Sequence, residues 1–219
     1  MEGKKKKEVD VLNEKSIIGG LLKGRYIIEK FLDKGSNGSV HNVVDIKDKD
    51  AQLVVKITTH YEDFGSEIKK MRRISKYSPA QGRFTTPEVV AYGMAVQGED
   101  LMAWVIMPRY GVNLEYVCEK VNYQLSTASI HDIGQSILST LEAVHKAGYI
   151  FSDLKLDNLM TGYKQKVYKD KDNESIFKDC SIHLVDFGYS SKYLDSKKNH
   201  IPEKRIETFR GNIVFASLA

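Results

Sequence analysis

The sequence predicts an α+β protein in which a strand-rich half precedes a helix-rich half. Two observations lead to this fold class. Between residues 25 and 107, short segments rich in β-branched and aromatic residues alternate with turn signals, a pattern typical of strands. After Gly111, apolar residues recur at the spacing of helices instead. We therefore expect a boundary between the two halves near residues 108–111.

Two segments carry the periodicity of amphipathic helices. Residues 62–77 are the one such segment in the strand-rich half, and their charges fall on the opposite face. Residues 128–148 contain the second, and Gly148 follows its last turn, where a glycine commonly ends a helix. The residues expected to face the core are Phe64, Ile68, Met71 and Ile74 in the first helix, and Ile133, Ile137, Leu141 and Val144 in the second.

Composition and charge divide the chain into three parts. Residues 1–24 are expected to form a basic extension, and the lysine run at 4–7 is most simply interpreted as solvated. Residues 25–107 would form the strand-rich lobe and residues 108–219 the helical lobe. A polar loop is expected at about 161–181, where mixed charges favour hydration over ligand binding.

The overall composition is that of a soluble globular protein, since 42% of the 219 residues are hydrophobic and 28% are charged. The net charge of +4 suits anionic ligands but is weak support for nucleic-acid binding, so we expect no specific nucleic acid. Two distant cysteines indicate a reducing compartment. No apolar run reaches membrane-spanning length and no signal peptide is recognisable, so we expect no membrane partner and a cytoplasmic location, or a compartment continuous with the cytosol.

The stretch YIFSDLKLDNLM, residues 149–160, places Asp153, Lys155 and Asn158 within an apolar run. Burying charge is costly unless a partner compensates it, so such a cluster indicates a ligand or metal site. A polar turn between two buried strands is the simpler alternative. A second acidic motif, Asp186-Phe187-Gly188, follows at the end of another apolar strand.

Further candidates lie upstream. Lys56 falls on a strand of β-branched residues, Glu67 on the first helix, and Gly35, Gly38 and Val40 in a turn between two strands. Each signal alone has a simple explanation, such as a hairpin glycine or a lysine on an edge strand. Their order along the chain is the informative feature. A glycine turn, strand lysine, helix glutamate, D-x-K-x-x-N and D-F-G form the protein-kinase signature set, which this chain resembles.

The resemblance can be narrowed to the casein kinase I family. Residues 192–217 resemble that family's activation segment, with K-Y, H-I-P and an element like G-T-x-x-Y-A-S in place of A-P-E. VIMPRYGVNLE, residues 105–115, resembles its hinge. The resemblance covers about residues 25–219, and the vaccinia-related kinases are a near alternative.

The resemblance implies a bilobal kinase that uses ATP and Mg²⁺ to phosphorylate serine or threonine in protein substrates. Asp153 would orient the acceptor hydroxyl, and Lys155 would steady the transferring phosphoryl group. Asn158 and Asp186 would hold Mg²⁺. The residues implied in nucleotide binding are Gly35, Gly38, Val40, Lys56, Glu67, Met107 and Tyr110.

The resemblance implies a particular role for most residues of that set. Lys56 would contact the α- and β-phosphates while Glu67 fixes its orientation. Backbone N–H groups around the two glycines would lie over the phosphates, since glycine allows close approach. Adenine would lie against residues 107–110, with Met107 as gatekeeper and the backbone of Pro108 and Tyr110 pairing with the purine edge.

Four positions depart from the family pattern. Asp33 replaces the first glycine of the turn, and Ser152 replaces the arginine of H-R-D. Asn212 replaces the threonine of G-T, and Val214 stands where the family has an anion-binding arginine. The base and the metal ligands are kept, which favours retained ATP chemistry.

The alternative function is a catalytically weak or inactive kinase-like module within a larger assembly. The departures favour it, and so does the position of Ala219 soon after the activation segment. We therefore expect a helical lobe that is truncated, and completed either by further chain or by a partner that covers its apolar surface.

Overall fold

The computed structural model describes residues 9–35, 38–77, 84–86, 88–165, 175–177, 180–202, 211, 212 and 214. The chain divides into two compact units. The N-terminal unit comprises Met1–Ile68 and Glu88–Arg109, and the C-terminal unit comprises Lys69–Pro87 and Tyr110–Ala219. The division after Arg109 falls within residues 108–111, where the sequence pattern changes.

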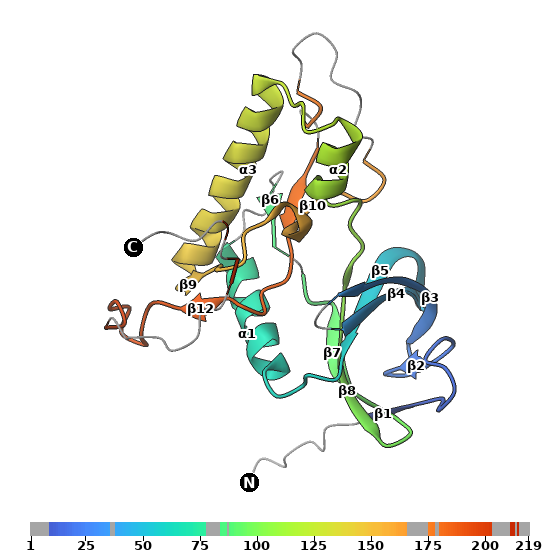
Figure 1. Cartoon of the computed structure of the whole chain (residues 1–219). Helices are drawn as coiled ribbons and strands as arrows, with labels where there is room; N and C mark the ends of the chain where they lie inside the picture. Colours follow the sequence, from blue (N-terminus) through green and yellow to red (C-terminus); the bar gives the residue numbers. More distant parts are fainter. Residues whose placement is uncertain are drawn as a thin grey trace. The chain divides into compact units, whose positions relative to one another are not determined.

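A seven-stranded sheet forms the N-terminal unit, in the order β1-β7-β8-β5-β4-β3-β2 (Figure 1). β1 lies parallel to β7, and the other neighbouring strands are antiparallel. Every second residue of β5, namely Leu53, Val55 and Ile57, belongs to the apolar cluster on one face of this sheet. The strands are β1 (Val9–Leu12), β2 (Leu21–Leu22), β3 (Tyr26–Gly35), β4 (Gly38–Asp45), β5 (Asp48–Thr58), β7 (Ala91–Gln97) and β8 (Asp100–Pro108).

β1 and β2 lie in the region expected to be an extension, so that expectation is corrected from Val9 onward. The two strands are at opposite ends of the strand order yet contact each other, which curls the sheet toward closure. Leu12 and Leu22 enter the apolar cluster, while Val11 is 82% exposed.

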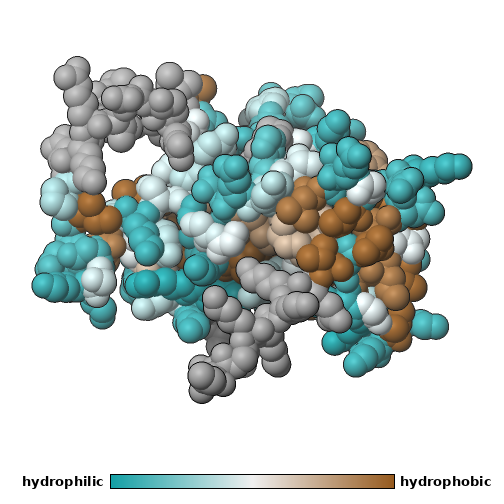
Figure 2. Space-filling view, turned by 90° about the horizontal axis from the view of Figure 1, so that it is seen from below, coloured by the Kyte–Doolittle hydropathy of each residue, from teal (hydrophilic) through white to brown (hydrophobic). Residues whose placement is uncertain are grey.

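Figure 2 shows apolar residues gathered on the surface of this unit's strands. Strands of four and two residues are too short to show a period. The lysine run lies outside the described residues.

The carboxylate of Asp10 joins three segments of this sheet. Its Oδ2 accepts a hydrogen bond from Trp104 Nε1 at 3.1 Å, and its Oδ1 accepts one from the Lys23 backbone N–H at 2.7 Å. The Lys23 ammonium lies over the rings of Tyr92 and Trp104, 5.5 and 5.6 Å from their centroids. Because Trp104 is fully buried, its N–H depends on Asp10 for an acceptor.

The first predicted helix is confirmed as α1 (Phe64–Ile74). Its four predicted core residues are all buried, with exposed fractions between 0 and 7%. Glu67 and a Lys-Arg-rich stretch occupy other positions of the helix, as the sequence pattern indicates. A short 3-10 helix, η1 (Ser75–Tyr77), follows.

The C-terminal unit contains two further α-helices and two small sheets among the described residues (Figure 1). Antiparallel β10 and β11 pair with each other, and β11 also pairs with β6 in parallel. β9 pairs antiparallel with β12. The elements are β6 (Phe84–Thr85), α2 (Leu114–Lys120), α3 (Thr127–Lys146), β9 (Tyr149–Ile150), η2 (Leu156–Asn158), β10 (Leu159–Thr161), β11 (Ile182–Leu184) and β12 (Ser191–Lys192).

The buried face of α3 differs from the predicted stripe. Ile133 and Val144 are buried as predicted, but Ile137 and Leu141 are only half-buried. Two hydroxyls on the buried face donate to carbonyls one turn earlier, at 2.6 and 3.1 Å, so polar residues pack there without unsatisfied groups. The small residues on this face are Ser129, Ser136, Thr140 and Ala143.

The ends of α3 follow the expected capping chemistry. The Ser126 side chain accepts the Ser129 N–H at the start, and Gly148 (φ +86°) follows the C-cap Ala147. No helix in the described part of the chain combines the length and apolar character needed to cross a bilayer.

The loop expected at 161–181 is not uniformly solvated. Thr161 belongs to β10, and Ile176 and Phe177 are buried. The Ile176 N–H donates to Ser129 Oγ at 3.1 Å, which fixes this part of the loop on α3. Residues 166–174, 178 and 179 lie outside the described part, so the expected hydration of that stretch stays a prediction.

We predict that Asp10→Ala lowers the free energy of unfolding by about 1–3 kcal/mol, because the buried Trp104 N–H loses its acceptor. Asp10→Asn keeps an acceptor oxygen and should cost less. Trp104 is the single tryptophan, so its fluorescence reports urea unfolding. Asp50→Ala, at an exposed position of β5, is the matched control. Equal stability of Asp10→Ala and Asp50→Ala would contradict the role given to Asp10.

Candidate functional site

The buried carboxylate of Asp153 is the centre of the candidate site. It lies between β9 and η2, and the residue is 7% exposed. The Asn158 amide donates to both the backbone oxygen and the carboxylate Oδ2 of Asp153, at 2.8 and 2.9 Å. Lys155 Nζ lies 3.4 Å from the same Oδ2. A charge buried this far needs such partners, so these three residues form one connected cluster.

The pairing of β10 with β11 brings the two predicted metal ligands to one end of a small sheet. Beyond the opposed pair Leu159 and Leu184, the Val185 N–H donates to the Asn158 backbone oxygen at 2.9 Å. Asp186 comes directly after Val185 and has a left-handed backbone (φ +63°), which aspartate tolerates better than most residues. Its Oδ1 accepts the Gly188 N–H at 3.3 Å.

The donor set at this end of the sheet suits Mg²⁺. The two hydrogens of the Asn158 amide are used on Asp153, which leaves the amide oxygen as a ligand. Asp186 supplies a carboxylate. Among the described residues no three His, Cys, Asp or Glu side chains form a metal-binding group. Mg²⁺ commonly takes one or two protein oxygens and completes its shell with phosphates and water, so these ligands fit it.

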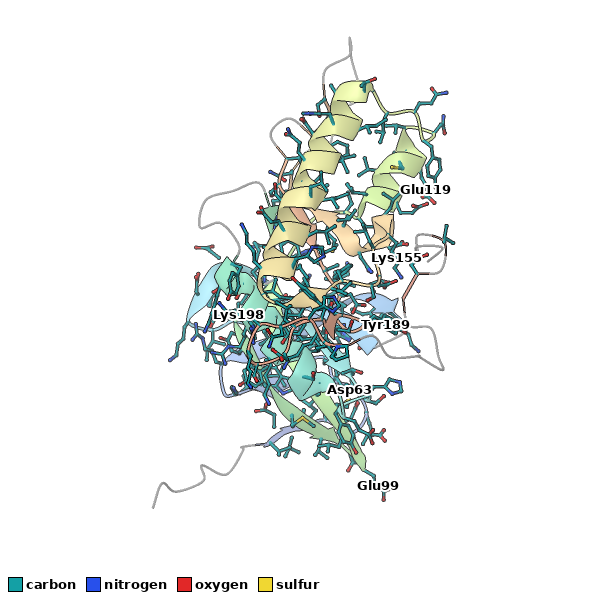
Figure 3. All side chains as sticks on the ribbon, turned by 90° about the vertical axis from the view of Figure 1, so that its left-hand side faces the viewer. Asp63, Glu99, Glu119, Lys155, Tyr189 and Lys198 are labelled. Atoms are coloured by element: carbon teal, nitrogen blue, oxygen red, sulfur yellow. The ribbon has the colours of Figure 1, made fainter. Side chains whose placement is uncertain are left out.

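The motif Asp186-Phe187-Gly188 is fixed on both sides. Phe187 is fully buried and meets Phe151 edge to face, with ring centroids 5.2 Å apart. Lys70, on α1, donates to the Gly188 carbonyl at 3.3 Å. Figure 3 shows Tyr189, the next residue, on the same side of the C-terminal unit as Lys155.

In the N-terminal unit, Lys56 and Glu67 meet as the motif order predicts. Lys56 Nζ lies 3.4 Å from Glu67 Oε1, and both side chains are about four-fifths buried, at 19 and 18% exposure. Lys56 is on β5 between Val40 of β4 and Val105 of β8. This burial makes the counter-ion necessary for an ammonium group.

The glycine turn is a β-hairpin in which Gly35 is paired with Gly38. Gly38 has φ +133°, and a Cβ there would collide with the Ile57 carbonyl, so this position requires glycine. No such constraint applies at Gly35. Asp33, opposite Val40, is exposed, and its Oδ1 accepts the Lys34 N–H at 2.7 Å.

The predicted nucleotide linker begins at the end of β8. Met107 is opposite Val54, and the Arg109 N–H donates to the Gln52 carbonyl at 2.9 Å. In the C-terminal unit, the Tyr110 ring stacks on His183, with centroids 4.2 Å apart. Burial lowers the pKa of His183 to about 4, so this ring is neutral at physiological pH.

Three of the four departures from the kinase pattern, Ser152, Asn212 and Val214, are linked by hydrogen bonds in the C-terminal unit. Gly211 (φ +134°) lies so close to the Ser152 carbonyl that a Cβ would collide with it, and the Asn212 N–H donates to that carbonyl at 3.2 Å. The Asn212 side chain accepts the Val214 N–H at 2.9 Å. Val214 is 79% exposed. The loop that contains Asp153 is thus joined to residues 211 and 212 through backbone groups.

No site role was predicted from the sequence for three residues that make contacts here, namely Lys70, Phe151 and Gly211. Lys70 stands three positions after Glu67, the spacing that places side chains on one helix face, and this was an available signal. Phe151, which stands at the histidine of H-R-D, and Gly211 had no independent signal, because their partners Phe187 and Ser152 are far away in sequence.

The fold and these motifs define a class of protein. The model of the protein kinase domain matches residues 26–217, and the chain belongs to the protein kinase family. The predicted α+β kinase fold is therefore confirmed.

Individual relatives are more distant. A protein of Encephalitozoon cuniculi named "Probable casein kinase I homolog" is 26% identical over 193 residues, which cover 88% of this chain and 54% of that protein. Nucleosomal histone kinase 1 of Drosophila melanogaster is 22% identical, over 86% of this chain and 32% of that protein. A Caenorhabditis elegans relative, whose name places it among the serine/threonine protein kinases, is 25% identical over 96% of this chain and 57% of that protein. The chain thus spans between a third and somewhat over half of these relatives.

We predict that Asn158→Ala lowers the free energy of unfolding by about 1.5–3 kcal/mol, because a buried carboxylate loses a charge-assisted hydrogen bond. Chemical denaturation followed by circular dichroism measures this change. The neighbouring exposed residue Asp157 supplies the control, since Asp157→Ala removes a side chain of similar size without affecting Asp153. Stability of Asn158→Ala within about 0.5 kcal/mol of the control would contradict the cluster.

Proposed function

We propose that this protein transfers the γ-phosphoryl group of ATP to serine or threonine hydroxyls of protein substrates, as a kinase of the casein kinase I type. The observation that carries the proposal is the intact cluster of Asp153, Lys155 and Asn158, with Asp186 at the same end of the β10–β11 pair. The family match supports the reaction class.

In the proposed reaction, Asp153 orients the acceptor hydroxyl. Its Oδ2 is bound to Asn158 and faces Lys155, which leaves Oδ1 as the acceptor for the substrate O–H. The Lys155 side chain is 36% exposed, so its ammonium can leave Asp153 for the transferring phosphoryl group. Catalysis here depends on positioning and charge neutralisation more than on covalent chemistry.

Two groups of residues in this chain would balance the negative charge of the nucleotide phosphates. Glu67 fixes the Lys56 ammonium, which would contact the α- and β-phosphates. Bound Mg²⁺ would neutralise charge on the phosphate oxygens, and Asn158 and Asp186 would hold it. The close approach of backbone at Gly38 suits N–H groups facing phosphate.

A kinase-like module with little turnover, held in a larger assembly, is the second candidate. Asp33 favours it, because a carboxylate near the glycine turn repels phosphate. However, Asp33 is exposed, so water and salt screen its charge, and its Oδ1 is bound to the next N–H. The repulsion is therefore smaller than the sequence suggests, and we favour the active enzyme.

The decisive experiment is phosphoryl transfer from labelled ATP to an acidic peptide containing serine, threonine and tyrosine. Asp153→Asn should reduce kcat by about 10²–10⁴-fold. Asp186→Asn should abolish the Mg²⁺-dependent part of ATP binding, and Lys56→Met should weaken binding. Phosphoamino-acid analysis should detect serine or threonine and no tyrosine.

The exposed neighbour Asp157 again serves as the control, because Asp157→Asn should keep wild-type kcat. An Asp153→Asn variant as active as the wild type would refute the mechanism. ATP binding without transfer in the wild type would favour the kinase-like module instead.

For substrate choice, we propose that acidic sites are partly preferred and that dependence on a prior phosphate is weak. Val214 stands where the family has an anion-binding arginine, and it is exposed and uncharged. Lys204, Arg205 and Arg210, which would supply positive charge, lie outside the described residues. Val214→Arg should therefore increase the preference for peptides with an upstream phosphoserine, as measured on a peptide array. A wild type that already depends strongly on that phosphoserine would overturn this proposal.

Hydrogen bonds to backbone groups hold the described part of the activation segment. Tyr193 joins it to α3, since its N–H donates to the Gly148 carbonyl at 3.1 Å and its hydroxyl to the His145 carbonyl at 3.0 Å. The Ile201 N–H donates to the Tyr193 carbonyl at 2.8 Å, and Asp195 accepts two backbone N–H groups of the intervening turn at 2.8 and 2.9 Å. The arginine that usually binds a loop phosphate is Ser152 here.

We predict that activity does not depend on phosphorylation of this segment. Phosphatase treatment and Thr208→Ala should each change kcat less than twofold, because main-chain bonds hold residues 191–202 and Ser152 offers no phosphate receptor. Packing of Ile201, Ile206 and Phe209 is expected to help order the segment, although Ile206, Thr208 and Phe209 lie outside the described part. A large loss after either treatment would show that another basic group binds a phosphate there.

A further inference from the structure

The end of the nucleotide linker lies beside β10 in the C-terminal unit. Residues 110–113 lead from the linker into α2, and Asn113 forms an antiparallel bridge with Met160. Residues 111–113 and residues 160–161 therefore pair like two short antiparallel strands. Thr161 is at the centre of this pairing, and none of the kinase motifs includes it.

Thr161 binds the linker through both its backbone and its side chain. The Gly111 N–H donates to the Thr161 carbonyl at 2.7 Å, and the Thr161 N–H donates to the Val112 carbonyl at 2.9 Å. The Thr161 hydroxyl accepts the Val112 N–H and donates to the Val112 carbonyl, each at 3.1 Å. Thr161 is fully buried, so no water replaces these bonds.

The close contact between residue 111 and β10 is possible only because residue 111 is glycine. A Cβ at residue 111 would collide with Thr161 Oγ1 and would lie 2.6 Å from the Gly162 carbonyl. No side chain larger than hydrogen is therefore compatible with this approach. The linker and β10 are held at a backbone distance that leaves little freedom.

The residue before Gly111 is fixed by a second contact with the same sheet. The Tyr110 ring stacks on His183 of β11, and His183 Nε2 lies 2.9 Å from Ser181 Oγ. Ser181 also bonds to Gln165 Oε1 through its hydroxyl, at 3.2 Å, and its N–H, at 2.9 Å. Adjacent linker residues are thus attached to both β10 and β11.

We propose that Thr161 is a positioning residue for the nucleotide base. Its hydroxyl and backbone fix Gly111 and Val112, and through them the backbone of Tyr110 that would pair with the purine edge. This inference rests on the proposed kinase function. A loss of the hydroxyl leaves the chemical groups around Asp153 in place, so it alters base binding and not phosphoryl transfer.

The test compares Thr161→Val, which keeps the shape but removes the hydroxyl, with Thr161→Ser, which keeps the hydroxyl. Thr161→Val should raise the KM for ATP about 5–10-fold. It should also lower the ratio of the KM for GTP to the KM for ATP, because the purine edge is held less precisely. The kcat should change less than twofold. Thr161→Ser should restore both values to within twofold of the wild type. Because KM does not depend on the fraction of folded protein, a general loss of stability would not give this result.

Thr140→Val is the matched control. Thr140 is also a buried threonine, and its hydroxyl donates to the Ser136 carbonyl within α3. It should lower thermal stability without changing either KM. A Thr161→Val variant whose KM for ATP and nucleotide ratio equal those of Thr140→Val would overturn the proposal.

If Thr161→Val does not fold, hydrogen exchange of the Gly111 and Val112 amides in the wild type still decides. Hydrogen exchange of the wild type should show the Gly111 and Val112 amides among the protected ones, and ATP should protect them further. Unprotected amides, or no effect of ATP on them, would overturn the proposal. A wild type that binds no ATP at all would instead remove the proposed function itself.

Discussion

The buried carboxylate of Asp153 is the constraint on which the site depends. A charge at this depth must be paired, and the Asn158 amide and the Lys155 ammonium supply the pairing within six residues of chain. Both partners come from the same loop as Asp153, so folding of that loop is enough to bring the three side chains together. Both amide hydrogens of Asn158 are bound to Asp153, so the same contacts that stabilise Asp153 leave the Asn158 oxygen available for the proposed Mg²⁺.

The short β10–β11 pair connects this cluster to the rest of the C-terminal unit. At one end, Val185 binds Asn158 and places Asp186 next to it. At the other end, Thr161 binds Gly111 and Val112 of the linker. The two ends are separated by only three residues of strand, about 10 Å. One short element therefore carries both the proposed metal ligands and the contact that fixes residues 111 and 112.

The arginine of H-R-D is Ser152 in this chain, and the described contacts to the activation segment there are made by backbone groups. In this chain the Ser152 carbonyl accepts the Asn212 N–H, and Gly211 permits the close approach. Backbone bonds from Tyr193 to the end of α3 hold the earlier part of the activation segment. None of these contacts uses a phosphate group, whereas an arginine and phosphate pair depends on phosphorylation. The departures therefore change how the segment is held more than they change the catalytic groups.

The sequence by itself determined the fold class, α1 with its buried stripe, and the grouping of Asp153, Lys155 and Asn158. These features depend on local periodicity or on residues that are close along the chain, which a single sequence records. Only the tertiary structure decided the strand role of Val9–Leu12, the small-residue face of α3, and the contacts of Thr161 and Gly211. Each of these depends on a backbone or small side chain meeting a partner far along the chain. Such contacts carry no hydrophobic period, because their specificity comes from hydrogen bonds and from the absence of a Cβ.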